Sequence, residues 1–281
     1  MRSLPPLVPT SWLADHLHEP DLRIVDATVQ ITPAFQVTSG RGDWERAHVP
    51  GAGFADLLEL SDPSAPAFMF RMPTAERFAA YMGRLGIGDG TRVVIYDARE
   101  NMWAARLWWM LRAFGFDAAG VLDGGWTSWR LEQRATCAQP CGAAPTTFTA
   151  HPRPGLIVDQ QEMLAALRDP SIRIVSALGR RSHRGEINEY GRPGHIPGAS
   201  NVSAWALIDR STQRYRAESE LRALFGPLLD AKRIITYCGG GIASSSDAFV
   251  LHLLGHRDVA VYMAGLLEWC ANPALPMEVG A

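Results

Sequence analysis

One segment of the chain combines the residue types of a nucleophilic site. Residues 234–247 read IITYCGGGIASSSD: an apolar run ends at Cys238, three glycines follow, and a helical pattern begins. Sites in parallel α/β sheets form beyond the carboxyl ends of strands. Glycines let successive N–H groups point at one spot, and a helix N-terminus adds positive potential there. The segment therefore predicts that Cys238 is a nucleophile with a stabilised thiolate. The alternative is a buried structural cysteine followed by a glycine-rich turn.

Two chemistries place a cysteine at the start of such a loop. A cysteine-dependent phosphatase needs an arginine six positions after the cysteine to clamp the phosphate. That position is Ser244 in this chain. The missing arginine argues against phosphatase chemistry and leaves sulfur transfer through a cysteine persulfide.

The other three cysteines carry weaker signals. Cys137 and Cys141 form a CxxxC pair that could bind a metal or form a redox disulfide. No second pair of ligands follows at the spacing of a zinc site, so we interpret both as incidental. Cys270 lies outside any glycine loop, and we expect it to be inert. So few cysteines cannot form a disulfide scaffold, and their scarcity predicts a cytoplasmic protein.

The chain repeats itself, which indicates a duplicated domain of roughly 130 residues. In the first copy Asp97 stands where the second copy has Cys238. The paired segments, in the same order in both copies, are 8–27 with 158–177, AHVPGAGF (47–54) with GHIPGASN (194–201), RVVIYD (92–97) with RIITYC (233–238), and 115–129 with 255–269.

Each copy alternates short β-branched runs with helical patterns, which favours an α/β fold with a mainly parallel sheet flanked by helices. We predict a non-catalytic domain over 1–134, a linker rich in Pro, Ala, Gly and Thr over 135–153, and a catalytic domain over 154–281. The expected strands are 23–26, 92–96 and 120–122, with partners at 173–175, 233–237 and 259–262; the expected helices include 104–114 and 247–254.

Composition excludes several classes of protein. The 281 residues are 47% hydrophobic and 20% charged, with a formal net charge of −2. This balance is typical of a globular protein and not of a disordered chain. The near-neutral charge provides no broad basic field for nucleic acid or an anionic membrane. No window resembles a membrane span, and we do not expect a secretory signal in the first residues, where charges precede any apolar stretch.

Together these features resemble a two-domain sulfurtransferase of the rhodanese family over nearly the whole chain. The resemblance is carried by the duplication, by the HVPGA and HIPGA boxes, by VLDGGWTSW in the first copy, and by YCGGGIAS in the second. The sequence C-G-G-G after Tyr237 is similar to the mercaptopyruvate-type loop, C-G-x-G, more than to the basic loop of the thiosulfate type.

The resemblance implies a mechanism that uses neither a metal nor an organic cofactor. Cys238 would attack the sulfur of 3-mercaptopyruvate or thiosulfate, and a thiol or cyanide would then remove the outer persulfide sulfur. A thioredoxin-like reductant is one candidate acceptor; nucleic acid and membrane are not expected partners. The backbone N–H groups expected to stabilise the charged sulfur belong to Gly239, Gly240, Gly241, Ile242, Ala243 and Ser244.

Arginines are expected to hold the donor carboxylate. Arg184 resembles the arginine of the family's R-x-R-G segment, with an exposed surface arginine as the alternative. A second family arginine is replaced by Leu178, and Arg180 and Arg181 are candidates to compensate.

Further departures from the family pattern occur at Gly240, Met263 and Ala264. They motivate a second hypothesis, a weakly catalytic sulfur carrier or partner-binding module. His48 and His195, in the duplicated HxPGA boxes, are expected to be hydrogen-bonded turn residues. The tryptophans expected in the core or at a domain interface are Trp108, Trp109, Trp126, Trp129, Trp205 and Trp269.

Overall fold

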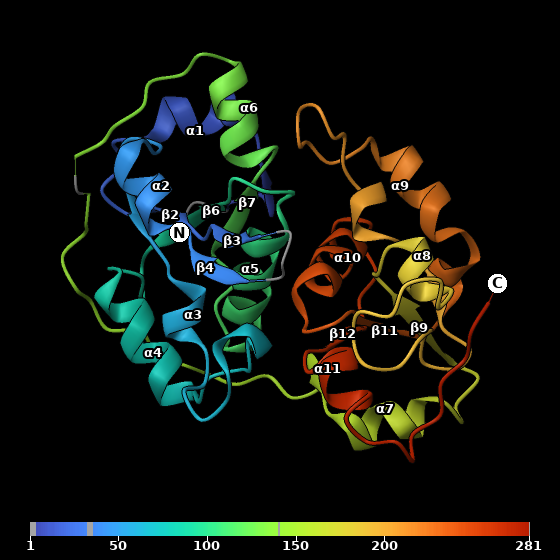
Figure 1. The fold of residues 1–281 in the computed structure, drawn as a ribbon. Helices are drawn as coiled ribbons and strands as arrows, with labels where there is room; N and C mark the ends of the chain where they lie inside the picture. Colours follow the sequence, from blue (N-terminus) through green and yellow to red (C-terminus); the bar gives the residue numbers. More distant parts are fainter. Residues whose placement is uncertain (1–3, 33–35, 140, 281) are drawn as a thin grey trace. The chain divides into compact units, whose positions relative to one another are not determined.

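The structure is a computed structural model that describes residues 4–32, 36–139 and 141–280. The chain divides into two compact units. Unit 1 runs up to Arg153 and also includes Arg210–Tyr215, whereas unit 2 contains Pro154–Asp209 and the chain from Arg216 onward. Figure 1 shows helices flanking a sheet in each unit.

Unit 1 is built on a five-stranded sheet in the order β1-β7-β6-β2-β5, with every neighbouring pair parallel. The β3 and β4 strands form a separate antiparallel ribbon. The elements are β1 (Leu7–Val8), α1 (Thr10–His16), β2 (Leu22–Asp26), β3 (Val29–Ile31), β4 (Val37–Ser39), α2 (Arg41–Arg46), β5 (Ala52–Phe54), α3 (Leu57–Leu60), α4 (Ala75–Arg84), β6 (Arg92–Tyr96), α5 (Met102–Ala113), β7 (Ala119–Leu122) and α6 (Gly125–Leu131), with a short 3-10 turn, η1, at Ala67–Met69.

Unit 2 has a second five-stranded parallel sheet, in the order β10-β9-β11-β12-β8. Its elements are β8 (Ile157–Val158), α7 (Gln160–Ala166), β9 (Ile172–Ser176), α8 (Arg180–His183), β10 (Ser200–Asn201), η2 (Ala204–Ala206), α9 (Glu218–Phe225), η3 (Gly226–Asp230), β11 (Arg233–Tyr237), α10 (Ile242–Leu253), β12 (Val259–Tyr262) and α11 (Gly265–Trp269).

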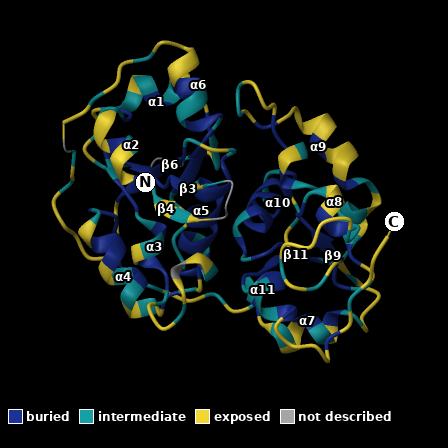
Figure 2. Cartoon of the chain, viewed as in Figure 1, coloured by how far each residue is buried: buried dark blue, intermediate teal, exposed yellow. Residues whose placement is uncertain are grey.

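The two sheets have the same topology when each strand is paired with its sequence counterpart. Reading β8, β12, β11, β9 and β10 against β1, β7, β6, β2 and β5 gives one strand order. The sequence repeat therefore folds into two copies of the same α/β domain, each a parallel sheet flanked by helices. In Figure 2 the strands of both sheets are buried, while α4 and α9 turn exposed faces outward.

The HxPGA boxes form the same turn in both units. The Ala52 N–H donates to Val49 O at 2.9 Å, across Pro50 and a Gly51 with φ of 81°. This is the type II turn that the order Pro-Gly favours. The strand-end tyrosine Tyr96 fixes the turn, because its hydroxyl accepts the Val49 N–H.

Residues 135–153, predicted as a linker, run along unit 1. The Thr146 N–H donates to Gly83 O, and the His151 N–H donates to Phe114 O. The Arg210–Tyr215 segment also joins unit 1, where the Tyr215 N–H donates to Asp123 and Thr212 O accepts from the Ser128 hydroxyl.

Most of the tryptophans expected inside are buried: Trp108, Trp109, Trp129 and Trp269. Trp126 is half-buried against the core of unit 1. Trp205 does not lie in the core, because 37% of it is exposed. It lies in the short η2 turn, where its neighbour Ala204 is buried instead. No helix in the described part of the chain has the length and apolar character needed to cross a membrane.

Candidate active site

Cys238 is the first residue after β11, the central strand of the unit 2 sheet. It is 4% exposed, at the carboxyl edge where parallel strands leave their loops. The neighbouring strand β9 is in register with β11, so that Tyr237 pairs with Ser176. The loops after these two strands therefore start side by side.

The carbonyl groups at the start of the Cys238 loop turn toward α11. Cys238 O accepts the Leu266 N–H at 2.9 Å, and Gly239 O accepts the Leu267 N–H at 3.0 Å. Gly265 permits this approach, because a Cβ there would lie 2.3 Å from Cys238 O. Gly265 also has a φ of 55°, which favours glycine. The α11 N-terminus therefore fixes the orientation of the loop peptides.

Several backbone N–H groups of the Cys238 loop and of the first turn of α10 have no hydrogen-bond acceptor among the described residues. Among the residues that the structure describes, none accepts from the N–H groups of Gly239, Gly240, Ile242, Ala243 or Ser244. Gly241 is the N-cap of α10, with φ of 81°, and its carbonyl accepts the Ser245 hydroxyl at 2.6 Å. The positive end of the α10 dipole adds to these amides, so the loop is suited to an anionic group.

Ser244 connects the loop amides to the thiol. Its hydroxyl lies 3.5 Å from Cys238 Sγ and can donate to the sulfur. Its carbonyl accepts the Thr236 hydroxyl at 2.9 Å, which anchors the first turn of α10 to β11. Of the residues predicted for the site, Cys238 and Ser244 are thus brought into contact.

Unit 1 shows what occupies the equivalent position when the cysteine is absent. Asp97 follows β6, and the loop to α5 is one residue longer, with N-cap Asn101 in place of Gly241. The Asp97 carboxylate accepts the Arg99 N–H at 2.6 Å and the Ala104 N–H at 2.8 Å. Ala104 is the third residue of α5, as Ser244 is the third residue of α10. A side-chain carboxylate therefore fills the amide site of unit 1.

Sequence reasoning missed Asp247, which lies within α10. The side chain is fully buried, and neither carboxyl oxygen has a hydrogen-bond partner among the described residues. Burial, and to a smaller extent negative charge on Cys238, raises the pKa of Asp247 well above its ordinary value. A carboxyl held in its neutral form adds no negative charge beside the thiol.

Sequence reasoning also missed Tyr190, because this residue is far along the chain from Gly239, which it contacts. Gly239 packs directly against the tyrosine ring, since a Cβ on Gly239 would lie 2.3 Å from Tyr190 Cε1. Burial raises the pKa of the Tyr190 hydroxyl, and negative charge on Cys238 raises it further. The glycine at 239 is therefore needed for packing as well as for the loop.

The three predicted arginines lie on the loop that follows β9 but differ in their surroundings. Arg180 and Arg181 are exposed on α8, and Arg181 Nε lies 3.4 Å from Glu186 Oε2. Arg184 is half-buried, with its nearest carboxylate oxygen, on Glu186, 4.0 Å away. No described residue accepts a hydrogen bond from the Arg184 guanidinium, which leaves its donors available. Leu178, in place of a family arginine, is buried.

The two box histidines are oriented alike. His48 Nδ1 contacts Trp44 O at 2.6 Å, and His195 Nδ1 contacts His183 O at 2.8 Å. Their rings stack on Trp44 and His183 respectively. Burial, and then the neighbouring His195, lowers the pKa of His183 to about 4, so that ring is neutral near pH 7.

Comparisons with known proteins agree with this architecture. The rhodanese-like domain model matches residues 9–132 and 159–272. The chain is 32% identical over 274 residues to human 3-mercaptopyruvate sulfurtransferase, covering 94% of this chain and 91% of that protein. It is 31% identical over 275 residues to the thiosulfate sulfurtransferase of Rattus norvegicus, covering 94% and 91%. The crystal structure of the 3-mercaptopyruvate sulfurtransferase SseA from Escherichia coli superposes with a TM-score of 0.83 at 29% identity, covering 93% of this chain and 99% of that one.

The fold and the cysteine loop thus define a duplicated α/β enzyme with its two copies in tandem. The chain belongs to the rhodanese family of sulfurtransferases.

Proposed function

We propose that Cys238 carries sulfane sulfur as a persulfide. The Cys238 thiolate attacks the sulfur of 3-mercaptopyruvate, an S–S bond forms, and the C–S bond breaks. The electron pair of that bond passes to the methylene carbon, which takes up a proton, so pyruvate leaves. An acceptor thiolate or cyanide then attacks the outer sulfur and returns Cys238 as a thiolate. No net oxidation occurs in this transfer.

The observation that carries the proposal is the set of open amides around a buried thiol. The N–H groups of Gly239, Gly240 and Ser244 have no acceptor among the described residues. The Ser244 hydroxyl is placed to donate to the sulfur. Such donors, fixed before the reaction, stabilise negative charge on a thiolate and on the terminal sulfur of a persulfide.

The charge of the loop favours 3-mercaptopyruvate over thiosulfate as the donor. Residues 239–246 carry no ionic side chain, and the next residue, Asp247, is held toward its neutral form. Backbone dipoles suit the single carboxylate of a keto acid better than the compact dianion of thiosulfate. Arg184, with its donors open, is the side chain we assign to that carboxylate. Arg180 and Arg181 remain candidates to support it.

The acceptor in this proposal is a small thiol, cyanide or a thioredoxin-like reductant. A free thiol at Cys238 suits a reducing compartment, and we place the protein in the cytoplasm. Unit 1 has no sulfur-transfer role in the proposal, because Asp97 stands in place of the nucleophile. Sulfurtransferase relatives of both the mercaptopyruvate and the thiosulfate type support the assignment.

Donor assays test the proposal directly. Pyruvate release from 3-mercaptopyruvate and thiocyanate formation from thiosulfate and cyanide are measured for the full chain and for Cys238→Ser. We expect a higher kcat/KM for 3-mercaptopyruvate and loss of both activities in the variant. Poor turnover of both donors, with ready transfer from a protein persulfide, would favour the sulfur-carrier alternative. Equal turnover by Cys238→Ser would exclude Cys238 as the sulfur carrier.

A further inference from the structure

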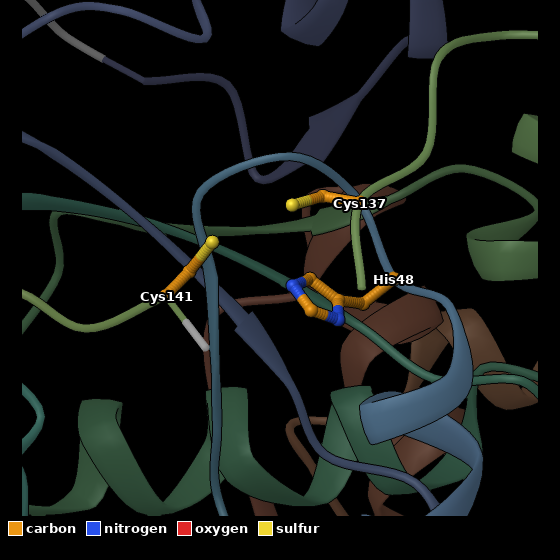
Figure 3. A group of neighbouring side chains, drawn as sticks. All are labelled: His48, Cys137 and Cys141. Carbon is orange, nitrogen blue, oxygen red and sulfur yellow. The ribbon is translucent and has the colours of Figure 1, made fainter. Parts of the chain in front are cut away.

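The structure brings the two linker cysteines of unit 1 together with a histidine from the first HxPGA box. Each of His48, Cys137 and Cys141 offers one ligand atom, and these atoms all lie within 4.8 Å of one another. Figure 3 shows the two thiols and the imidazole edge converging from the linker and from the turn after α2. Tetrahedral zinc with sulfur and nitrogen ligands places such atoms about 3.6–3.8 Å apart, so small rotations would close the site.

The position of His48 is fixed by the backbone and by its own ring. His48 and Cys137 form an antiparallel bridge, with both N–H···O bonds at 2.9 Å. His48 Nδ1 contacts Trp44 O at 2.6 Å, so this nitrogen carries the proton and Nε2 presents a lone pair. His48 is fully buried, and Nε2 has no hydrogen-bond partner among the described residues. Figure 3 shows this nitrogen on the side of the ring that faces the sulfurs.

Unit 2 provides an internal comparison for the same position. There the bridge joins His195 to Glu278, whose carboxylate lies 3.8 Å from His195 Nε2 and accepts the Gly198 N–H at 2.9 Å. In unit 1 the bridge partner is Cys137 and not an acid, so the histidine nitrogen lacks the carboxylate that its counterpart has. Two thiols occupy that place, and Cys137 Sγ accepts the Gln139 N–H at 3.3 Å.

We propose that His48, Cys137 and Cys141 form a binding site for a zinc-class divalent cation in unit 1. Two thiolates and a neutral imidazole balance a 2+ charge, which is the condition for burying an ion at low cost. Thiolate and imidazole ligands select zinc over magnesium or calcium. Cys137 and Cys141 are half-buried, and Cys141 lines a cavity of about 600 Å³, which gives access for the ion and for a water as fourth ligand. The bound ion fastens the linker to the HxPGA turn.

A disulfide between the two cysteines is the competing use of this cluster. It would leave His48 Nε2 buried without a donor or a cation, at the cost of an unpaired polar group. The lone pair of His48 Nε2, which faces the two sulfurs, therefore favours a bound metal ion over a Cys137–Cys141 disulfide.

Cobalt binding tests the proposal independently of sulfur transfer. The full chain with Cys238→Ser, which removes the reactive thiol of unit 2, is reduced, freed of metal with a chelator, and titrated with Co²⁺ and then Zn²⁺. We expect one equivalent of Co²⁺ to bind with a thiolate charge-transfer band and to be displaced by Zn²⁺. Adding Cys137→Ser and Cys141→Ser should weaken Zn²⁺ binding by more than about 100-fold. Loss of a residue that only supports a metal ligand already costs up to about that factor, and these substitutions remove the ligands themselves.

Adding Cys270→Ser instead is the matched control, because that cysteine lies outside the cluster, and binding should be unchanged. Zn²⁺ should also raise the melting temperature of the protein with the intact cluster and not of the protein without it. Binding of equal strength after loss of Cys137 and Cys141, or no binding by the reduced protein, overturns the proposal. A Cys137–Cys141 disulfide in a protein without metal affinity overturns it in favour of a redox pair.

Discussion

The Asp97 carboxylate and the Cys238 thiol occupy corresponding points in the two units, each directly after the central strand of a parallel sheet. Asp97 accepts the Ala104 N–H at 2.8 Å, whereas the matching N–H, that of Ser244, has no acceptor among the described residues. One fold thus presents the same amide site twice, filled by a carboxylate in unit 1 and open in unit 2. This contrast supports the proposal that unit 2 is the half in which an external anionic group binds.

Gly265→Ala is expected to impair sulfur transfer by moving the Cys238 loop. The new Cβ would meet Cys238 O at 2.3 Å and Gly239 O at 2.6 Å, so the loop peptides that aim the amides must shift. We expect kcat/KM for 3-mercaptopyruvate to fall at least about tenfold, since small misplacement of catalytic groups is costly. Steady-state assays of pyruvate release measure this effect.

Gly255→Ala provides the control for backbone strain. Gly255 also has a positive φ, 84°, but a Cβ there has nothing within 4 Å. The left-handed conformation should cost each variant about 1 kcal/mol of unfolding free energy, and the clash adds to this loss in Gly265→Ala, whereas only Gly265→Ala should lose activity. Equal activity in the two variants would show that the contact with Cys238 O does not position the loop.

Arg184→Ala is expected to raise the KM for 3-mercaptopyruvate. A charge-assisted hydrogen bond to the donor carboxylate is worth about 1.5–3 kcal/mol, which corresponds to a KM increase of about 10–150-fold. Arg181→Ala tests the competing candidate, which we expect to have the smaller effect because Arg181 is 71% exposed and already near Glu186. An unchanged KM in Arg184→Ala, with a large increase in Arg181→Ala, would move the carboxylate site to the exposed arginine.

Asp97→Asn is expected to change the pH dependence of stability. Burial raises the pKa of Asp97 to about 7, although the Ala104 and Arg99 N–H groups act against the shift. The folded protein therefore keeps this proton between about pH 4 and pH 7, where the unfolded chain releases it. The unfolding free energy should fall with rising pH across that window, by up to about 1.4 kcal/mol per pH unit from this group.

Urea denaturation at a series of pH values measures this slope for the protein and for Asp97→Asn. The pKa of Asp26 is also raised by burial, to about 6, so the difference between the two proteins is clearest between about pH 6 and pH 7. The variant should lack the part of the slope that comes from Asp97. Identical slopes would mean that Asp97 is ionised in the folded protein.

Local sequence signals predicted the elements that position the site. The β-branched runs and the repeat located the strands that precede Asp97 and Cys238, and the glycines after Cys238 marked the loop. These features depend on residues that are neighbours along the chain, so hydrophobic periodicity and local composition reveal them. The strand order was not predicted from the sequence; the structure shows it to be the same in both units.

Contacts between distant segments were not predictable in the same way. Tyr190 lies against Gly239 in unit 2, and His48 reaches the linker cysteine Cys137 in unit 1, only because each fold brings separate loops together. The sequence signals for the second contact were the histidine of the HxPGA box and the CxxxC pair, because both are residue types that bind zinc. Asp247 stood in a run of small residues, and its burial depends on packing that periodicity does not report.

Direct detection of sulfur on Cys238 tests the central claim most closely. The reduced protein is mixed with one equivalent of 3-mercaptopyruvate without acceptor, and intact and peptide masses are measured alongside released pyruvate. The persulfide mechanism predicts one added sulfur atom, located on Cys238, for each pyruvate, and its removal by cyanide. Sulfur found on another cysteine, or pyruvate released without sulfur on Cys238, would contradict it.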